Sequence, residues 1–293
     1  MENKIHIVYG PTASGKTSYS LELAQKSDSV IINGDAMQIY REIPIITNQP
    51  TAEERGVIPH ELFGLKSIVE NSDMNKWLDM VLPLIKRVMA ENKIPIIVGG
   101  TGMYLKALIK GISTIPEVPV EIKNEIRKRF KDVGINEFYN LLKVKDPLSA
   151  EKIKPGDSQR MMRALEVMEY TGVSIKQWNT QPHKTFFDEK DFEIHFLDRP
   201  REEIYKNIDE RFENFIELGA LEEAEKANEI FKGSGLSELE IESLPAYKAH
   251  GLRELISYIK GEISLETAIK HSQQVTRNYA KRQLTWWRGQ MNY

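Results

Sequence analysis

The 293-residue sequence contains no cysteine. This absence excludes disulfide bonds, zinc–thiolate sites and a cysteine nucleophile, and it is compatible with the reducing cytoplasm. Long hydrophobic runs are missing as well, since no stretch approaches the roughly 18 apolar residues of a membrane span. The first residues are polar and lead directly into a short apolar run, which leaves no room for a signal peptide. We therefore expect a cytoplasmic protein without membrane contact.

A large excess of charge of one sign is also missing. The formal net charge of -3 argues against a surface that is uniformly basic and binds nucleic acid everywhere. Basic residues nevertheless gather between Lys270 and Arg288, a segment that contains no acidic residue and in which Tyr279, Trp286 and Trp287 are interleaved. This local pattern favours contact with single-stranded RNA through charge and stacking.

Short apolar runs predict buried parallel strands at residues 5–9, 30–32 and 94–98. Between the second and third runs, residues 74–92 carry apolar side chains at a helical period, which predicts a crossover helix. Strands that alternate with helices in this way are typical of an α/β fold with a parallel sheet.

A glycine-rich segment follows the first predicted strand. The residues GPTASGKT match the phosphate-loop pattern GxxxxGKS/T and precede a predicted helix, as that pattern requires. The loop can curl so that its amides point at phosphate oxygens, while the lysine adds positive charge and the final hydroxyl suits Mg²⁺. We expect phosphate binding by the whole loop and a metal ligand in its last residue: Gly10, Pro11, Thr12, Ala13, Ser14, Gly15, Lys16 and Thr17. The pattern alone does not identify the phosphate or its reaction.

The composition of the sequence changes after Gly111, where Pro116 and Pro119 precede a charged segment of helical period. Residues 192–197 then predict a strand that rejoins the first sheet. We therefore predict an α/β fold in which a P-loop NTPase-like parallel sheet core carries a helical insertion domain. The core comprises residues 1–116 and 191–293, including C-terminal helices, and the insertion comprises residues 117–190.

Two polar residues follow predicted strands at the edge where open α/β sheets bind ligands. Asp35 comes directly after the second strand, and Thr101 lies in the segment GGTGMYL after the strand at residues 94–98. Both side chains should face the phosphate loop. The alternatives are a turn-forming aspartate and a helix-capping threonine.

Together, these elements resemble the tRNA dimethylallyltransferase (IPP transferase) family over nearly the whole chain. The resemblance rests on five segments in the family's order: GPTASGKT, DAMQIY, VGGTGMYL, DPLSAEKIKPGDSQRMMRALEV and TRNYAKRQLTWWR. The sequence departs from the family pattern at Ala36, where serine is usual, at Trp287, where phenylalanine is commoner, and at Lys123, where arginine is expected. PAYKAHG also differs from the commoner Gly-Tyr-Lys-Glu form. Ala36 removes one hydroxyl and Lys123 lacks the planar guanidinium, but neither touches the expected chemistry.

The resemblance implies transfer of a dimethylallyl group from dimethylallyl diphosphate to the exocyclic amine of adenosine 37, on the 3′ side of the anticodon. The tRNAs would be those that read codons beginning with U, and diphosphate would leave. Asp35 would act as base, Lys16 would stabilise the departing diphosphate, and Thr101 would hydrogen-bond it. The implied cofactor is Mg²⁺ and the implied partner is the anticodon stem-loop of tRNA, bound by a monomer.

The expected tRNA contacts fall into groups along the chain. They comprise the strand-end residues Asp35, Ala36, Met37, Gln38 and Thr101, the insertion residues Lys123, Gln159, Arg160, Met161, Met162 and Arg163, and the C-terminal residues Arg277, Lys281 and Arg282. Gln38 would read the adenine edge unless it is a solvated helix residue, and the arginines of the insertion could form a solvated basic face. At the C-terminal end we expect the tryptophans to lie in the core and the cations to contact RNA.

Other functions remain open on the residues alone. A P-loop small-molecule kinase using ATP would share the phosphate loop, although no apolar strand ending in aspartate supplies an obvious second metal-binding motif. An adenylate prenyltransferase acting on free AMP or ADP would need neither the insertion nor the basic C-terminal segment. A nucleotide-switched RNA-binding module would leave Asp35 dispensable.

Overall fold

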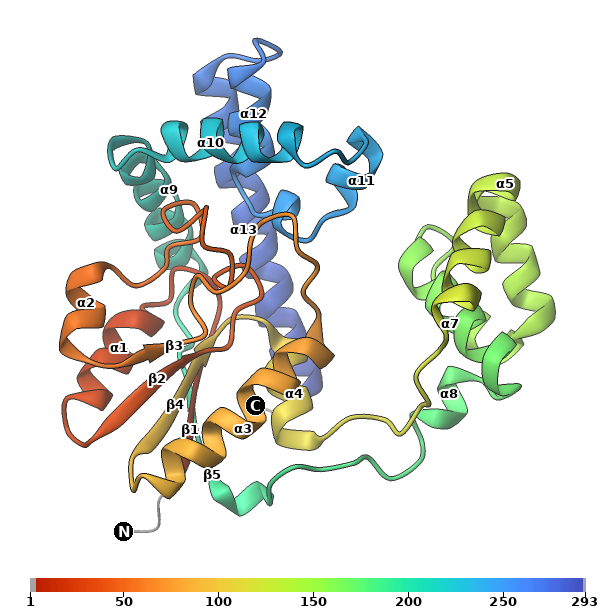
Figure 1. Cartoon of the computed structure of the whole chain (residues 1–293), viewed down its shortest axis with the longest axis horizontal. Coiled ribbons are helices and arrows are strands. Elements are labelled where there is room, and N and C mark those ends of the chain that lie inside the picture. Colours follow the sequence, from red (N-terminus) through yellow and green to blue (C-terminus); the bar gives the residue numbers. More distant parts are fainter. Residues whose placement is uncertain (1–3, 292–293) are drawn as a thin grey trace. The chain divides into compact units, whose positions relative to one another are not determined.

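The computed structural model describes residues 4–291, which divide into two compact units (Figure 1). The core unit contains the described residues up to Ile109 and from Phe187 onward, and the insertion unit is Lys110–Phe186. The insertion unit begins and ends earlier in the sequence than the expected range 117–190. Its entry and exit segments pair with each other, because the backbone amides of Ile112 and Lys184 each donate to the other's carbonyl at 3.1 and 2.9 Å.

The core unit is built on a five-stranded sheet in which every described pair of strands is parallel. The strands are β1 (Ile5–Tyr9), β2 (Ser29–Asn33), β3 (His60–Glu61), β4 (Ile94–Gly99) and β5 (Phe192–Phe196), in the order β3-β2-β4-β1-β5. This confirms the predicted strands and the predicted parallel sheet. The strand β3 was not predicted, because two residues are too few to make an apolar run.

Helices cover both faces of the sheet, with α1 (Lys16–Ala24) and α3 (Met74–Ala90) on opposite sides in Figure 1. On the α1 side, Ala24 packs with Val8 and Ile31 of the sheet. The predicted crossover helix is α3, which begins where the side chain of Asp73 accepts a hydrogen bond from the amide of Lys76 at 3.0 Å. The helix α2 (Ala52–Val57) lies between β2 and β3 in the sequence, and α4 (Gly102–Lys110) follows β4.

Beyond β5 the core unit is helical. The elements are α9 (Arg201–Glu217), α10 (Ala220–Gly233), α11 (Glu238–Ser243), α12 (Leu252–Ile259) and α13 (Leu265–Gln290), with a short 3-10 turn at Ala246–Lys248. Another 3-10 turn, Glu189–Asp191, comes directly before β5. The long helix α13 reaches back to the sheet, where Trp287 is buried and its ring lies 4.1 Å from that of Tyr9. Trp287 therefore belongs to the core, as expected, whereas Trp286 is half-buried.

The insertion unit is a separate helical fold with its own apolar core. It contains α5 (Val120–Lys145), α6 (Pro147–Ala150), α7 (Ser158–Thr171) and α8 (Ile175–Trp178). The helix α5 is broken at Gly134, whose φ of 74° lies in the left-handed region that glycine tolerates best. Phe138 and Leu142 of α5 pack against Met161 and Leu165 of α7, so that this unit is held by apolar burial of its own.

The ends of β2 and β4 approach each other closely. The amide of Gly34 donates to the carbonyl of Val98 at 2.7 Å, and a Cβ atom added to Gly99 would lie 2.1 Å from the carbonyl oxygen of Gly34. Only glycine fits at position 99 without moving backbone. This contact brings the loops that follow β2 and β4 to the same point.

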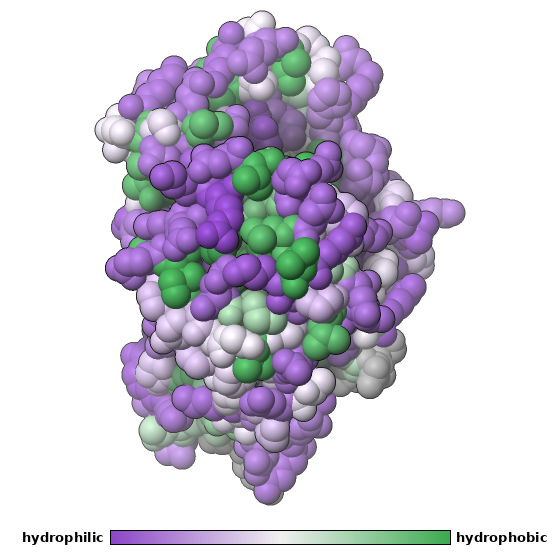
Figure 2. All heavy atoms as spheres, turned by 90° about the vertical axis from the view of Figure 1, so that its right-hand side faces the viewer, coloured by the Kyte–Doolittle hydropathy of each residue, from purple (hydrophilic) through white to green (hydrophobic). Residues whose placement is uncertain are grey.

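No helix within residues 4–291 is long and apolar enough to cross a membrane. Figure 2 shows hydrophilic side chains over most of the face that it presents, with hydrophobic residues gathered in smaller areas between them. The large apolar side chains that are exposed come from several elements, among them Val57, Val144 and Leu239. Scattered exposure of this kind is normal for folded proteins.

We expect Gly99→Ala to lower the free energy of unfolding by about 1–3 kcal/mol, because the added methyl group must displace backbone. Gly289→Ala is the matched control, since nothing lies within 4 Å of a Cβ atom there and the residue is in a helix. Urea denaturation of both variants measures the difference. Equal stability of the two variants would contradict the steric account.

Candidate active site

The phosphate loop connects β1 to α1, as predicted, and its backbone takes the required curled form. Gly15 and Ala13 have φ values of 87° and 63°, so that even a non-glycine residue is held in the left-handed region. A Cβ atom on Gly10 would lie 2.7 Å from the carbonyl oxygen of Leu197, which explains why glycine is needed where the loop begins. The loop amides therefore surround the N-terminus of α1, the arrangement that favours phosphate.

Side chains from a distant part of the sequence hold this loop. The Nδ2 atom of Asn207 in α9 donates to the carbonyl of Ala13 at 3.2 Å, and the Nη2 atom of Arg211, one turn later, donates to Oγ1 of Thr12 at 2.6 Å. Helix α9 thus fixes the phosphate loop from outside.

Lys16 and Arg211 are half-buried and bring two positive charges to the site. The Nζ atom of Lys16 donates to the carbonyls of Gly10 and Pro11 at 3.1 and 2.7 Å. Burial lowers the pKa of Lys16 to about 8, with Asp35 acting in the opposite direction. Burial likewise lowers the pKa of Arg211 to about 10. Two cations that face one carboxylate leave a net positive charge, which favours an anionic ligand.

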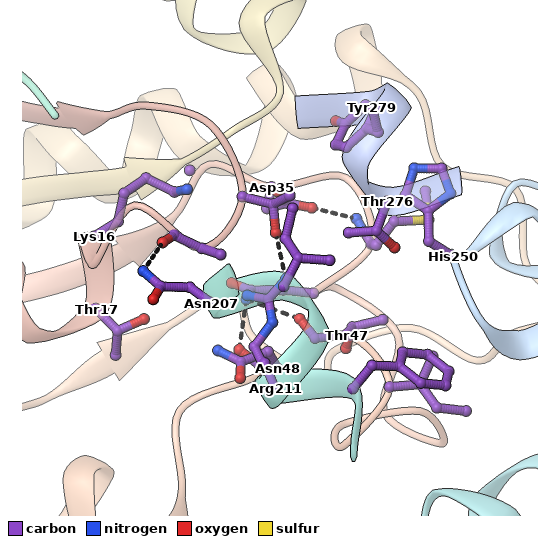
Figure 3. Close-up of a pocket in the computed structure, with 18 of the residues that line it drawn as sticks. Lys16, Thr17, Asp35, Thr47, Asn48, Asn207, Arg211, His250, Thr276 and Tyr279 are labelled. Atoms are coloured by element: carbon purple, nitrogen blue, oxygen red, sulfur yellow. Dashed lines mark hydrogen bonds between the residues drawn. The ribbon is translucent and has the colours of Figure 1, made fainter. Parts of the chain in front are cut away.

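Asp35 lies just beyond β2 and is oriented by backbone amides on both sides. Its Oδ1 atom accepts a hydrogen bond from the amide of Met37 at 2.9 Å, and its Oδ2 atom faces the amide of Gly100 at 3.4 Å. The amide of Asp35 itself donates to Oδ1 of Asn33 at 2.7 Å. The carboxylate therefore bridges the loops after β2 and β4 and points into the cavity shown in Figure 3.

Thr101 lies next to Asp35 but behind the wall of the cavity. Its Oγ1 atom accepts a hydrogen bond from the amide of Ala36 at 2.9 Å, and its hydroxyl is hydrogen-bonded to that of Tyr279. Burial raises the pKa of Tyr279, so that its phenol stays protonated. Thr101 thus fixes the Asp35 loop and the Tyr279 ring.

The cavity has a volume of about 360 Å³. One part of its wall is polar, with Lys16, Thr17 and Asn207 (Figure 3), and another part is apolar, with Phe212 and Phe215. A small molecule with a charged head and an apolar tail fits such a divided pocket.

The residues that could hold Mg²⁺ are hard oxygen donors. Thr17 and Asp35 both line the cavity, and a bound diphosphate would contribute further oxygens. These donors suit Mg²⁺, so the expected role of Thr17 is compatible with the structure.

Several cavity residues were not found from the sequence: Asn207, Arg211, His250, Thr276 and Gln283. Tyr279, which was named only as part of the basic aromatic segment, lines the cavity too. Asn207 and Arg211 stand four residues apart in a helix, next to the buried apolar positions Ile204 and Ile208. Polar residues at helical spacing beside an apolar stripe were the available signal, but that pattern is also typical of a solvated face.

His250 and Tyr279 form an aromatic part of the cavity wall. Their ring centroids lie 4.7 Å apart. Burial and, to a smaller extent, the nearby Arg282 together lower the pKa of His250 to about 4. The imidazole is therefore neutral near pH 7 and adds no charge to the site.

The side chain of Gln38 holds the loop that contains Thr47 and Asn48. Its Nε2 atom donates to the carbonyls of Thr47 and Asn48 at 3.0 and 2.7 Å. The amide nitrogen is thus occupied in holding the loop, and the reading of an adenine edge would fall to the amide oxygen. Met37 and Gln38 both line the cavity, whereas Ala36 contacts Thr101 through its backbone.

In the insertion unit, the expected RNA-binding residues differ in exposure. Arg160 is 75% exposed and 3.4 Å from Asp157, and Arg163 is 41% exposed and 3.5 Å from Glu166. Gln159 is exposed, and Lys123 and Met162 are half-buried. The expectation for Met161 has to be corrected, because its side chain is 0% exposed and packs in the apolar core of this unit.

The C-terminal cations lie on α13. Arg277 forms an ion pair with Asp209 of α9, whereas Lys281 and Arg282 are exposed. The guanidinium of Arg282 lies over the ring of Tyr279, 5.7 Å from its centroid. Neither Lys281 nor Arg282 takes part in the ion pair between Arg277 and Asp209.

A P-loop α/β core, with half-buried cations and a carboxylate in one cavity, defines an enzyme that acts on a phosphate-bearing substrate. The family model described as IPP transferase matches residues 38–290. The chain therefore belongs to the IPP transferase family. The fold predicted from the sequence is confirmed.

Individual relatives agree with this assignment. The tRNA dimethylallyltransferase of Ehrlichia chaffeensis is 42% identical over 290 residues, which cover 98% of this chain and 91% of that protein. A solved eukaryotic dimethylallyltransferase acting on tRNA superposes with a TM-score of 0.83 at 28% identity, covering 99% of this chain and 72% of that chain. The crystal structure of the tRNA isopentenylpyrophosphate transferase of Bacillus halodurans superposes with a TM-score of 0.66 at 30% identity. The match covers 98% of this chain and 87% of that chain.

We expect diphosphate to bind more weakly above pH 8. The pKa of Lys16 is lowered to about 8 in the free protein, and a neighbouring anion raises it, so that binding at higher pH requires uptake of a proton. The affinity attributable to Lys16 should fall by up to about tenfold per pH unit. Calorimetric titration with diphosphate between pH 7 and 9.5 measures the slope.

Lys16→Arg is the control for the ionisation of diphosphate itself, because arginine keeps its charge throughout this range. The parent protein should lose affinity more steeply than the variant above pH 8. Parallel curves for the two proteins would show that Lys16 is already fully charged in the free site.

Proposed function

We propose that this chain transfers the dimethylallyl group of dimethylallyl diphosphate to the exocyclic amine of adenosine 37 in tRNA, releasing diphosphate. The tRNAs are those that read codons beginning with U. The observation that carries the proposal is the position of Lys16, Arg211 and Asp35 in one cavity (Figure 3), where a leaving anion and an attacking amine meet their partners.

The leaving group gathers negative charge as its carbon–oxygen bond breaks. Lys16 and Arg211 line the cavity in which this charge would develop. Lys16 would exchange the loop carbonyls that it contacts for diphosphate oxygens, and such placed donors stabilise the transition state. Each such donor contributes about 3–4 kcal/mol in well-studied active sites. Mg²⁺ held at Thr17 would neutralise further diphosphate charge.

The attacking amine must lose a proton as it forms the new bond. Asp35 is the candidate base, because its carboxylate lines the cavity and is aimed by the amides of Met37 and Gly100. Proton abstraction by a positioned carboxylate contributes about 10²- to 10⁴-fold to the rate. Thr101 holds the Asp35 loop in place by accepting the Ala36 amide, and its O–H would donate to the diphosphate after turning away from Tyr279.

An adenine stacked in a duplex cannot reach this cavity. The target base must therefore be an unpaired loop nucleotide or be turned out of its stack. The rings of His250 and Tyr279 offer a surface for such a base, and Phe212 and Phe215 offer an apolar wall for the prenyl chain. An anticodon loop presents its bases at low cost in unstacking.

RNA recognition outside the cavity would use charge. The exposed residues of the insertion unit, Gln159, Arg160 and Arg163, would contact the anticodon stem-loop, with Lys123 and Met162 beside them. On α13, Lys281 and Arg282 would contact phosphates, whereas Arg277 would first have to leave Asp209. We also propose that the protein acts as a monomer in the cytoplasm.

One assay distinguishes the functions that share a P-loop. The protein is incubated with Mg²⁺ and labelled dimethylallyl diphosphate, together with unmodified tRNA, with the same tRNA carrying guanosine at position 37, or with free AMP or ADP. We expect label only in the tRNA that has adenosine 37. Label in the free nucleotides alone would indicate an adenylate prenyltransferase. In parallel, phosphoryl transfer from ATP to small acceptors without any prenylation would indicate a kinase.

We expect Asp35→Asn to slow prenyl transfer by about 10²- to 10⁴-fold while tRNA binding stays within a few-fold of the parent protein. The amide keeps the shape of the side chain but cannot take the proton. Single-turnover transfer and filter binding measure the two effects. Asp79→Asn, at an exposed position of α3, is the matched control. Retained turnover in Asp35→Asn would remove the assignment of Asp35 as base.

We expect Arg160→Ala combined with Arg163→Ala to weaken tRNA binding and to lower the slope of log affinity against log salt by about one unit per lost phosphate contact. The chemical step measured at saturating tRNA should be unchanged. Lys152→Ala, an exposed cation of the same unit, is the control. An unchanged salt slope in the double variant would place these arginines outside the RNA interface.

A further inference from the structure

A cluster of three potential metal ligands lies on the sheet, away from the cavity. His6 belongs to β1, and Glu193 and His195 belong to β5, the edge strand that pairs with β1. The register pairs His6 with Glu193, and residues two apart in a strand point to the same face. The three side chains therefore share one face of the β1–β5 pair. None of them lines the described cavity.

The ligand atoms of these side chains converge. Nδ1 of His6 lies 2.9 Å from Nε2 of His195, and Oε1 of Glu193 lies 4.0 Å from the first nitrogen and 3.6 Å from the second. Zinc bonds to nitrogen and oxygen are about 2.0–2.2 Å long, so that tetrahedral ligands stand roughly 3.3 Å apart. The observed separations lie on both sides of that value, and shifts of a few tenths of an ångström would complete the triangle.

The surroundings of the cluster prepare the imidazoles for a metal ion. The hydroxyl of Tyr19 in α1 lies 2.9 Å from Nδ1 of His195, so that it can accept the proton of that nitrogen and leave the lone pair of Nε2 facing His6. Partners of this kind orient metal-binding histidines. Burial lowers the pKa of both histidines, which keeps the rings neutral near pH 7. Their planes are also nearly parallel, at 8°.

We propose that His6, Glu193 and His195 form a binding site for a divalent transition-metal ion of the zinc class. Two neutral imidazoles and one carboxylate are a donor set that such ions prefer, whereas Mg²⁺ prefers oxygen alone. The half-exposed Glu193 leaves the fourth position open to water.

Such an ion would join the edge strand of the sheet to the strand that leads into the phosphate loop. Gly10 follows His6 after a few residues, and Arg199 follows His195 and donates to the carbonyl of Ser14 at 3.2 Å. The ion would thus stabilise the folded core at the base of the phosphate loop. The 2.9 Å contact between the two imidazoles, which such an ion would replace, also joins these strands.

The test uses the full chain without any added histidine tag, because a tag would bind the same ions. After treatment with a chelator and its removal, the protein is titrated with ZnCl₂ by calorimetry in the presence of excess Mg²⁺, and its melting temperature is followed. We expect one Zn²⁺ per chain with a dissociation constant in the micromolar range or below, and a melting temperature that rises with zinc concentration. Co²⁺ in place of Zn²⁺ should give the visible absorption of a nitrogen- and oxygen-bound ion.

Variants then locate the ion. Glu193→Gln, at a half-exposed side chain, should weaken zinc binding at least tenfold, and His195→Ala should abolish it. His271→Ala, at an exposed histidine of α13, is the matched control and should bind like the parent protein. If His195→Ala does not fold, Glu193→Gln and His6→Gln decide. Absence of zinc binding, or binding that these variants leave unchanged, would overturn the proposal.

Discussion

The geometry of the site depends on three loops that meet at one point: the phosphate loop and the loops that follow β2 and β4. The close approach of Gly34 and Gly99 brings the ends of β2 and β4 together, and the buried side chain of Gln283 fastens them to the phosphate loop. Its Oε1 atom accepts a hydrogen bond from the amide of Thr12 at 2.8 Å, while its Nε2 atom donates to the carbonyl of Gly100 at 2.8 Å. A helix from the far end of the sequence thereby sets the distance between the anion site and Asp35. Loss of either bond would leave a buried backbone group unpaired, which costs about 1–3 kcal/mol.

The electrostatics of the cavity follow from that arrangement. Lys16 and Arg211 are both partly removed from water, and both lose basicity as a result, while Asp35 partly restores it. Charges buried in this way interact more strongly than they would in water. The free protein occupies Lys16 with the carbonyls of its own loop, so that an incoming diphosphate exchanges these weak acceptors for its charged oxygens.

The sequence predicted the features that are local in the chain. The phosphate loop was recognisable because its residues are consecutive. Asp35 and Thr101 were recognisable because each lies three residues beyond a predicted apolar strand. Arg211 and Gln283 were missed, because they reach the cavity from helices far along the sequence and their spacing is also typical of solvated faces. His250 was missed because it lies in the turn before α12, where no periodic pattern marks it. Met161 was misassigned, since the motif around it does not show which of its residues turn inward. The two-residue strand β3 lacked enough residues for a pattern.

The central claim is that one cavity grips a diphosphate while Asp35 takes a proton from an adenine amine. The most direct measurement is a crystal structure of the chain with Mg²⁺, a non-hydrolysable thio analogue of dimethylallyl diphosphate and an anticodon stem-loop. The account predicts the diphosphate on the phosphate-loop amides, Lys16 and Arg211, with the adenine amine within hydrogen-bonding distance of the Asp35 carboxylate. A diphosphate bound elsewhere, or an adenine whose amine faces away from Asp35, would contradict it.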